Sequence, residues 1–151
     1  MKNLEVRIKN TTELPLPQYQ TAGAAGFDFL AAVKESVTIE PGKIEIVPTG
    51  LHFAFPEGYE LQVRARSGLA AKHGIGLVNS IGTIDSDYRG EILVILINHG
   101  DKPFVINRGD RIAQGVMAKH ETAVWQEVSE LDETERNHKR FGSTGYSNKI
   151  K

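Results

Sequence analysis

The 151 residues fit one domain, and 40% hydrophobic with 25% charged residues is the balance of an ordinary globular protein. A net charge of −1 argues against a dedicated duplex-binding surface, and the absence of cysteine excludes disulfides and thiolate chemistry. The N-terminus lacks the apolar region of a secretory signal and no apolar run is long enough to span a membrane, so we expect a cytoplasmic protein with no nucleic-acid or membrane partner.

Alternating apolar and polar residues predict short β-strands along most of the chain, beginning with Leu4, Val6 and Ile8. The pattern recurs at residues 44–47, 51–55, 59–63, 104–106 and 124–128. Turn sequences such as Pro41-Gly42 separate these runs. Many short strands with frequent turns indicate an all-β sandwich, jelly roll or barrel.

One short helix is predicted at residues 67–72, with Ser67 as its N-cap and Gly74 ending it. The segment 92–97, ILVILI, does not alternate, which is typical of a strand buried on both faces. Such a strand lies either at the centre of a sandwich or at a subunit interface. From about Leu131 the chain becomes polar and then rich in Gly and Ser, which indicates a mobile tail. We therefore expect one domain at residues 1–130 and an arm at 131–151.

Two segments have the residues of a phosphate site and of a water-activating site. In RSGLA (66–70), free amides at a helix start and the Arg66 guanidinium suit phosphate, although a capped turn with a surface arginine has the same sequence. In GTIDSDYRGE (82–91), Asp85 and Asp87 are spaced to bind a divalent cation or to orient a water. The alternative is a hairpin turn, which Asp, Ser and Gly favour. Ile81 and Ile84 flank the acids, however, and burying an aspartate between apolar strands costs free energy unless the carboxylate is hydrogen-bonded or functional.

Three further segments are ambiguous when each is taken alone. NRGDRIAQ (107–114) fits a turn into a strand with Asp110 and Arg111 as surface charges, and FGSTG (141–145) fits either an anion nest beside a base-stacking Phe141 or a disordered terminus. AGAAGFDF (22–29) fits a tight turn into a strand, with Asp28 as a capping or turn residue. The phosphate-binding P-loop sequence is absent from the chain.

Taken together, AGFDF (25–29), RSGLA (66–70), GTIDSDYRGE (82–91), RGDRIAQ (108–114) and FGSTG (141–145) resemble, in this order, the five motifs of the trimeric dUTP diphosphatases. The resemblance implies a jelly-roll-like homotrimer whose C-terminal arm reaches a neighbouring subunit. It also implies hydrolysis of dUTP to dUMP and pyrophosphate by water attack on the α-phosphorus, with Mg²⁺ as cofactor. This reaction would lower dUTP, limit uracil in DNA and supply dUMP for thymidylate synthesis.

The resemblance also implies roles for individual residues. Asp85, Gln114 and Arg66 would be catalytic, with Asp85 activating the water. The substrate-binding residues would be Arg66, Ser67, Gly68, Asn79, Thr83, Ile84, Asp85, Tyr88, Leu93, Arg136, Phe141, Gly142, Ser143 and Thr144. Asn79 and the backbone of Ile84 and Leu93 would read uracil, and Tyr88 would exclude a 2′-hydroxyl. Mg²⁺ would rest on the triphosphate with no direct protein ligand, and Asp28 would reach it through water or support the phosphate site.

The chain departs from the family pattern at two places. Ala65 replaces the usual proline before the second motif, which softens the approach to the phosphate loop. Residues 137–140, NHKR, replace three glycines of the fifth motif, so that either Arg136 or Arg140 would contact the γ-phosphate. A dCTP deaminase of related fold and a non-enzymatic nucleotide-binding trimer are the competing functions.

Overall fold

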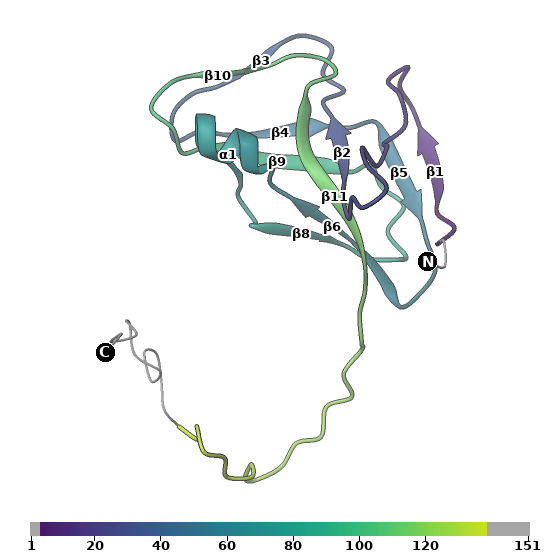
Figure 1. Ribbon diagram of the computed structural model, residues 1–151, viewed down its shortest axis with the longest axis vertical. Coiled ribbons are helices and arrows are strands. Elements are labelled where there is room, and N and C mark those ends of the chain that lie inside the picture. Colours follow the sequence, from purple (N-terminus) through teal and green to yellow (C-terminus); the bar gives the residue numbers. More distant parts are fainter. Residues whose placement is uncertain (1–3, 139–151) are drawn as a thin grey trace.

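The computed structural model describes residues 4–138 of the chain, which form eleven strands and one short helix (Figure 1). The strands are β1 (Arg7–Asn10), β2 (Phe27–Leu30), β3 (Val37–Ile39), β4 (Ile44–Pro48), β5 (Leu51–Ala54), β6 (Tyr59–Arg64), β7 (Ile75–Leu77), β8 (Ile81–Ile84), β9 (Leu93–Asn98), β10 (Phe104–Ile106) and β11 (Arg111–Lys119). The helix is α1 (Ser67–His73). The predicted all-β fold with one short helix is confirmed, as is the strand at Phe104–Ile106.

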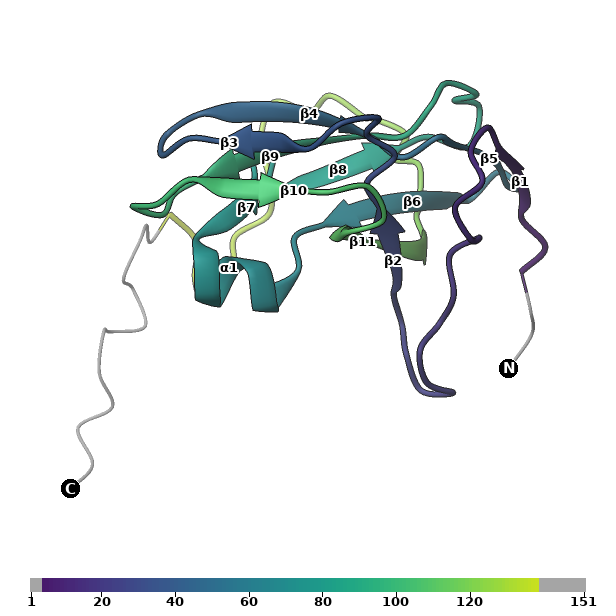
Figure 2. The same cartoon turned by 90° about the horizontal axis from the view of Figure 1, so that it is seen from above.

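These strands pair antiparallel throughout the described part of the chain. The largest sheet has the order β2-β11-β6-β8, the next has the order β4-β9-β7, and β1-β5 and β10-β3 form two smaller sheets. The sheets are layered over one another, and α1 lies beside β10 outside the layers (Figure 2). His73 at the end of α1 contacts Phe104 of β10, with ring centroids 5.0 Å apart.

Alternating side chains from several sheets form one hydrophobic core. Phe29, Leu61, Ile92 and Ile106 are completely buried in it, and burying each such side chain contributes about 1.5–3 kcal/mol. Gly115 of β11 lies directly under the aromatic part of this core, where an added Cβ would be 2.5 Å from the Phe27 ring. The missing side chain at Gly115 therefore lets β2 and β11 pair closely, and this pairing builds part of the candidate site.

The helix α1 begins and ends at residues that the sequence partly predicts. Arg66, with φ of −88° and ψ of 126°, is the N-cap and makes no side-chain capping bond, so the prediction of Ser67 as N-cap was wrong. The Arg66 side chain instead pairs with Asp28. Gly74 ends the helix as predicted, because its φ of 69° is left-handed and its amide donates to Ala70.

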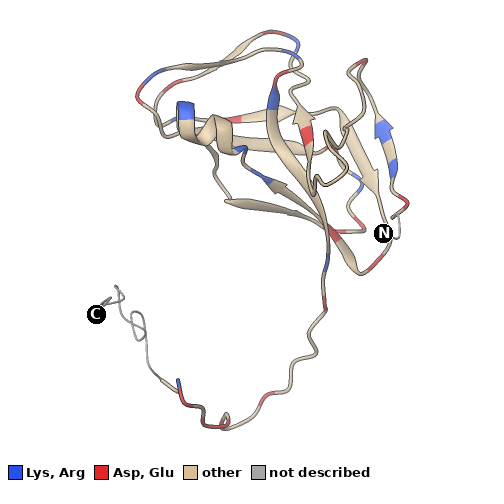
Figure 3. Ribbon diagram, viewed as in Figure 1, with Lys and Arg blue, Asp and Glu red and all other residues tan. Residues whose placement is uncertain are grey.

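Within the single chain, strand β9 is buried on one face only, so it does not lie at the centre of a sandwich, and the predicted alternative of a subunit interface stays a prediction. Val94 and Leu96 are 1% exposed, whereas Leu93 is 48% exposed. The outward side chains align in rows across the three-stranded sheet, where Ile95 pairs with Ile46 and Ile97 with Ile44. We call this surface the apolar face: Ile44, Ile46, Val78, Leu93, Ile95 and Ile97. Figure 3 shows almost no charge on these strands.

Residues 120–138 follow β11 without helix or strand and extend away from the sheets (Figure 1). The predicted strand at 124–128 was wrong for the single chain, because Val124 and Trp125 are 94% and 89% exposed and no strand in the described part of the chain pairs with them. The arm boundary at residue 131 stays a prediction. Among the described residues, no helix has the length and apolar character needed to cross a membrane.

Candidate active site

Asp28 on β2 is the centre of a charged cluster. Its side chain is 9% exposed, and its Oδ1 lies 3.0 Å from Nε of Arg66 while its Oδ2 lies 3.6 Å from Nε of Arg111. Gln114 is paired with Asp28 across the β2–β11 ladder and donates its amide N–H to Oδ1 at 3.4 Å. One buried carboxylate thus orients two guanidinium groups and an amide, and the cluster has a net positive charge.

The two arginines are also linked to each other, because Arg66 Nη1 donates to the Arg111 carbonyl at 3.1 Å. Their side chains remain 29% and 50% exposed, so both are open to a ligand. The first intrahelical bond of α1 runs from the Ala70 amide to the Arg66 carbonyl. The amides of Ser67 and Gly68 in the first turn therefore have no acceptor within the helix. The Arg66 guanidinium and the free amides at the start of α1 are donors of the kind that suits an anion.

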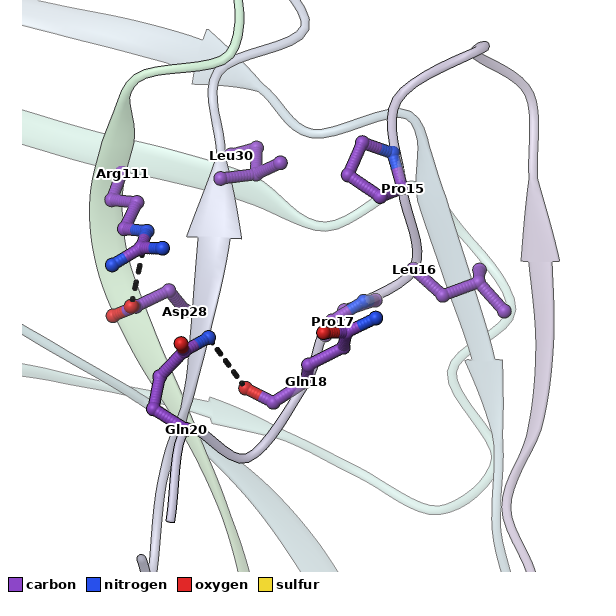
Figure 4. Close-up of a pocket in the computed structure, with 8 residues that line it drawn as sticks. All are labelled: Pro15, Leu16, Pro17, Gln18, Gln20, Asp28, Leu30 and Arg111. Carbon is purple, nitrogen blue, oxygen red and sulfur yellow. Dashed lines mark hydrogen bonds and ion pairs between the residues drawn. The ribbon is translucent and has the colours of Figure 1, made fainter.

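A pocket opens beside this cluster (Figure 4). Asp28 and Arg111 form part of its wall, and Leu30 lies above them on β2. The opposite wall comes from the segment Pro15–Gln18. The Nε of Arg111 points toward the Asp28 carboxylate (Figure 4). This contact orients the other N–H groups of the Arg111 guanidinium.

The residues of GTIDSDYRGE lie on β8 and in the turn after it. Asp85 and Asp87 are both exposed, so the predicted strain of an aspartate between apolar strands does not arise. The Tyr88 amide donates to the Asp85 carbonyl at 3.2 Å, which closes a turn and presents the Asp85 side chain to solvent. A turn is therefore present as predicted, but it closes no hairpin, because β8 pairs with β6 while β9 pairs with β4 and β7. The turn leaves the Asp85 carboxylate accessible to water or ligand.

This turn is attached to the rest of the protein by three contacts that the sequence did not predict. Glu91 Oε1 accepts from the Gly50 amide at 2.7 Å, and the His52 ring donates from Nδ1 to the Arg89 carbonyl at 3.0 Å. Buried Thr49 donates to the Ile92 carbonyl at 2.7 Å. The contacts join residues 49–52 to residues 89–92, which are about 40 positions apart in the sequence. The sequence alone does not show that these two segments lie side by side.

The predicted uracil-reading residues lie where β7, β8 and β9 meet. The Val78 amide donates to the Ile95 carbonyl and so extends the β7–β9 pairing toward Leu93, with Asn79 next along the chain. An added Cβ at Gly82 would be 3.2 Å from Nδ2 of Asn79, so the Asn79 amide lies against β8. Thr83 and Ile84 continue β8 from there to Asp85.

Within one chain, the cluster around Asp28 and the turn that contains Asp85 are well separated. Gln114 pairs with Arg64 of β6, whereas Ile84 pairs with Leu61, three residues along and on the far side of β6. Strand spacings of about 4.8 Å and a rise of about 3.3 Å per residue place the backbone of Ile84 about 14 Å from that of Gln114. The cluster around Asp28 and the turn with Asp85 therefore do not make one compact site in a single chain.

Arg111 is the site residue that sequence reasoning missed, since it was interpreted as a surface charge. Its contact with Asp28 depends on the β2–β11 register and on the bulge between Arg111 and Ala113. Neither is visible in the sequence. Asp110 is exposed, as predicted for a surface charge, and its carboxylate accepts from the Asn107 amide in the turn before β11. Arg136 is exposed in the segment after β11. Phe141, Gly142, Ser143, Thr144 and Arg140 lie outside the described residues.

A family model described as dUTPase matches residues 12–145. Two curated relatives are each named deoxyuridine 5′-triphosphate nucleotidohydrolase. The one from Rickettsia prowazekii is 52% identical over 147 residues and covers 96% of this chain and 99% of its own. The one from Finegoldia magna is 47% identical over 143 residues and covers 95% and 100%.

Solved structures share the fold. A mutant dUTPase of Staphylococcus bacteriophage 80alpha with dUpNHpp is 25% identical, has a TM-score of 0.85, and covers 94% of this chain and 99% of its own. A second mutant of the same phage enzyme is 26% identical with a TM-score of 0.84, and covers 95% and 99%. The family model that matches residues 12–145 and the identity of about 50% to curated relatives show that this chain belongs to the dUTPase family, a family of nucleotide hydrolases.

Proposed function

We propose that this protein hydrolyses dUTP to dUMP and pyrophosphate by water attack on the α-phosphorus. The names of both curated relatives and the dUpNHpp in the phage enzyme support this substrate. The structural observation that supports it most directly is the cluster in which buried Asp28 orients Arg66 and Arg111. Such a cluster suits an anion with several charged oxygens. The reaction would lower dUTP and supply dUMP, in keeping with the predicted cytoplasmic role.

In this mechanism Asp85 accepts a proton from the attacking water. Arg66, Gln114 and the amides of Ser67 and Gly68 hold phosphate oxygens and stabilise the charge that develops on the leaving pyrophosphate. Asn79, with backbone groups of Ile84 and Leu93, distinguishes uracil from cytosine, and a missed buried hydrogen bond there costs about 1–3 kcal/mol. Tyr88 lies under the deoxyribose. Arg136, Phe141, Gly142, Ser143 and Thr144 would close over the nucleotide from the arm.

Mg²⁺ is proposed to bind through the triphosphate. Within residues 4–138, no group of three or more His, Cys, Asp or Glu side chains is arranged to hold a metal. Both oxygens of Asp28 already contact Arg66, Arg111 or Gln114. A phage phi11 dUTPase of the same fold is described with a structural Mg(II) ion. When bound, Mg²⁺ would neutralise charge on the phosphate oxygens.

We further propose that three copies of the chain share three active sites. The apolar face is unusual for an isolated chain, because its outward Ile and Leu side chains cover one side of a sheet. The separation of the Asp85 turn from the Asp28 cluster supports a site completed by another copy. Val124 and Trp125, exposed in the segment after β11, would find apolar partners on a neighbour.

A pyrophosphate-release assay on dUTP, dTTP, dCTP and UTP, with and without Mg²⁺, tests the function. We expect release from dUTP alone, stimulated by Mg²⁺. Ammonia release from dCTP would favour the deaminase alternative. Binding of dUTP without pyrophosphate release would favour a non-enzymatic nucleotide-binding protein.

Asp28→Asn tests whether Asp28 acts by orienting the arginines. We expect kcat/KM for dUTP to fall about 10–100-fold, equivalent to about 1.4–2.7 kcal/mol, because Arg66 and Arg111 lose their shared anionic partner. The Mg²⁺ concentration for half-maximal activity should stay the same. Asp110→Asn is the matched control, since Asp110 is exposed and its amide replacement still accepts from Asn107. If Asp28→Asn instead shifts the Mg²⁺ requirement, Asp28 acts through the metal.

A further inference from the structure

The side chain of Tyr88 occupies the space directly over Gly90. A Cβ added to Gly90 would lie 2.1 Å from the Tyr88 hydroxyl oxygen, 2.4 Å from Cζ and 2.9 Å from Cε2. These are its three nearest atoms, so any side chain at position 90 would overlap the phenol first. The Tyr88 hydroxyl also donates to the Glu91 carbonyl at 3.1 Å, which keeps the ring over this stretch of backbone.

Glycine is required at position 90 because it leaves space for the Tyr88 side chain. Its ability to adopt a left-handed backbone conformation is not used there. The glycines with left-handed φ in the described chain are Gly42, Gly50, Gly58, Gly74 and Gly109. Gly90 is not among them, so an alanine can adopt its backbone conformation without strain. The only evident cost of alanine at position 90 is the collision with Tyr88.

The backbone at residue 90 cannot easily retreat from such a collision. Arg89 just before it is held through its carbonyl by His52, and Glu91 just after it is held through its carboxylate by the Gly50 amide. The Tyr88 side chain, in contrast, is 44% exposed and can turn toward solvent. A methyl group at position 90 is therefore expected to displace the Tyr88 ring and to leave the turn in place.

We propose that Gly90 is a positioning residue that determines sugar selectivity by seating the Tyr88 ring. The inference rests on the proposed function, in which Tyr88 packs under the deoxyribose and leaves no room for a 2′-hydroxyl. With its hydroxyl end against Gly90 and bonded to the Glu91 carbonyl, the Tyr88 phenol is held in one position. If the Tyr88 ring is displaced, the surface that contacts the sugar changes shape. The deoxyribose of dUTP then packs less well, and the 2′-hydroxyl of UTP is no longer excluded by steric overlap.

The test compares kcat/KM for dUTP and for UTP in wild type, Gly90→Ala and the control Gly23→Ala. An added Cβ at Gly23 meets nothing within 4 Å, so this control should behave as wild type. Packing against one small group discriminates by about 10–200-fold, and we expect Gly90→Ala to lower the dUTP/UTP ratio about tenfold or more. The thermal midpoint should change little, since the displaced ring can move into solvent.

A double-mutant cycle separates this role from a general structural one. Tyr88→Ala removes the collision, so adding Gly90→Ala to it should leave the dUTP/UTP ratio unchanged, and this pair remains informative even if Gly90→Ala alone folds poorly. An unchanged ratio in folded Gly90→Ala, or a further loss in the double variant, overturns the inference while the proposed function stands. A wild-type protein that releases no pyrophosphate from dUTP overturns the proposed function and this inference with it.

Discussion

Asp85→Asn is expected to lower the turnover of dUTP by about 10²–10⁴-fold, which is the usual contribution of a general base. The amide retains the size of the carboxylate and cannot accept the proton of the attacking water. The turn should persist, because its closing bond is made by the Asp85 main-chain carbonyl and the Tyr88 amide. Binding of dUpNHpp, measured by calorimetry, should therefore stay close to wild type while pyrophosphate release is lost.

Asp87→Asn is the matched control for this experiment. Asp87 is exposed in the same turn, two residues away, and has the same charge. We expect it to keep near-normal turnover. Normal turnover in Asp85→Asn would remove Asp85 as the base. Equal losses in both variants would show that the negative charge of the turn matters and that no single carboxylate activates the water.

The parts of the fold that local physics determines were predictable from the sequence. Period-two alternation located strands such as β6 and β10, because side chains on a half-buried strand point alternately inward and outward. Gly74 ended the helix as expected, since a left-handed residue after a helix favours glycine. The family motifs predicted Asp28, Arg66 and Gln114 as site residues, and the structure brings these three side chains together.

The sequence-based predictions failed or stayed open where segments distant in the sequence, or the proposed neighbouring subunits, would decide the outcome. Residues 124–128 alternate like a strand, but a strand needs a partner and the described residues 4–138 provide none. ILVILI is covered on one face only within the chain, which excludes the centre of a sandwich and leaves the predicted subunit interface as a prediction. Arg111 was missed because its position beside Asp28 follows from strand register. Two of these three cases leave apolar side chains exposed, which is why they point to neighbouring subunits.

Ile46→Glu is expected to convert the proposed trimer to monomers and to abolish most pyrophosphate release. Ile46 is 59% exposed in the single chain, so the folded monomer should tolerate the change within about 0.5 kcal/mol. In an assembly that buries the apolar face, each added carboxylate would be desolvated without a partner, at a cost of several kcal/mol per charge. Sedimentation equilibrium at micromolar concentration measures the change in mass, and circular dichroism checks that the monomer remains folded.

Val105→Glu provides a control that separates assembly through the apolar face from a general effect of surface charge. Val105 is 49% exposed on β10 and belongs to a different sheet from the apolar face. This variant should remain a trimer with wild-type activity. A trimeric Ile46→Glu variant would show that the apolar face is not the interface. A folded, monomeric and fully active Ile46→Glu variant would show that one chain forms a complete site, despite the roughly 14 Å between the backbones of Ile84 and Gln114.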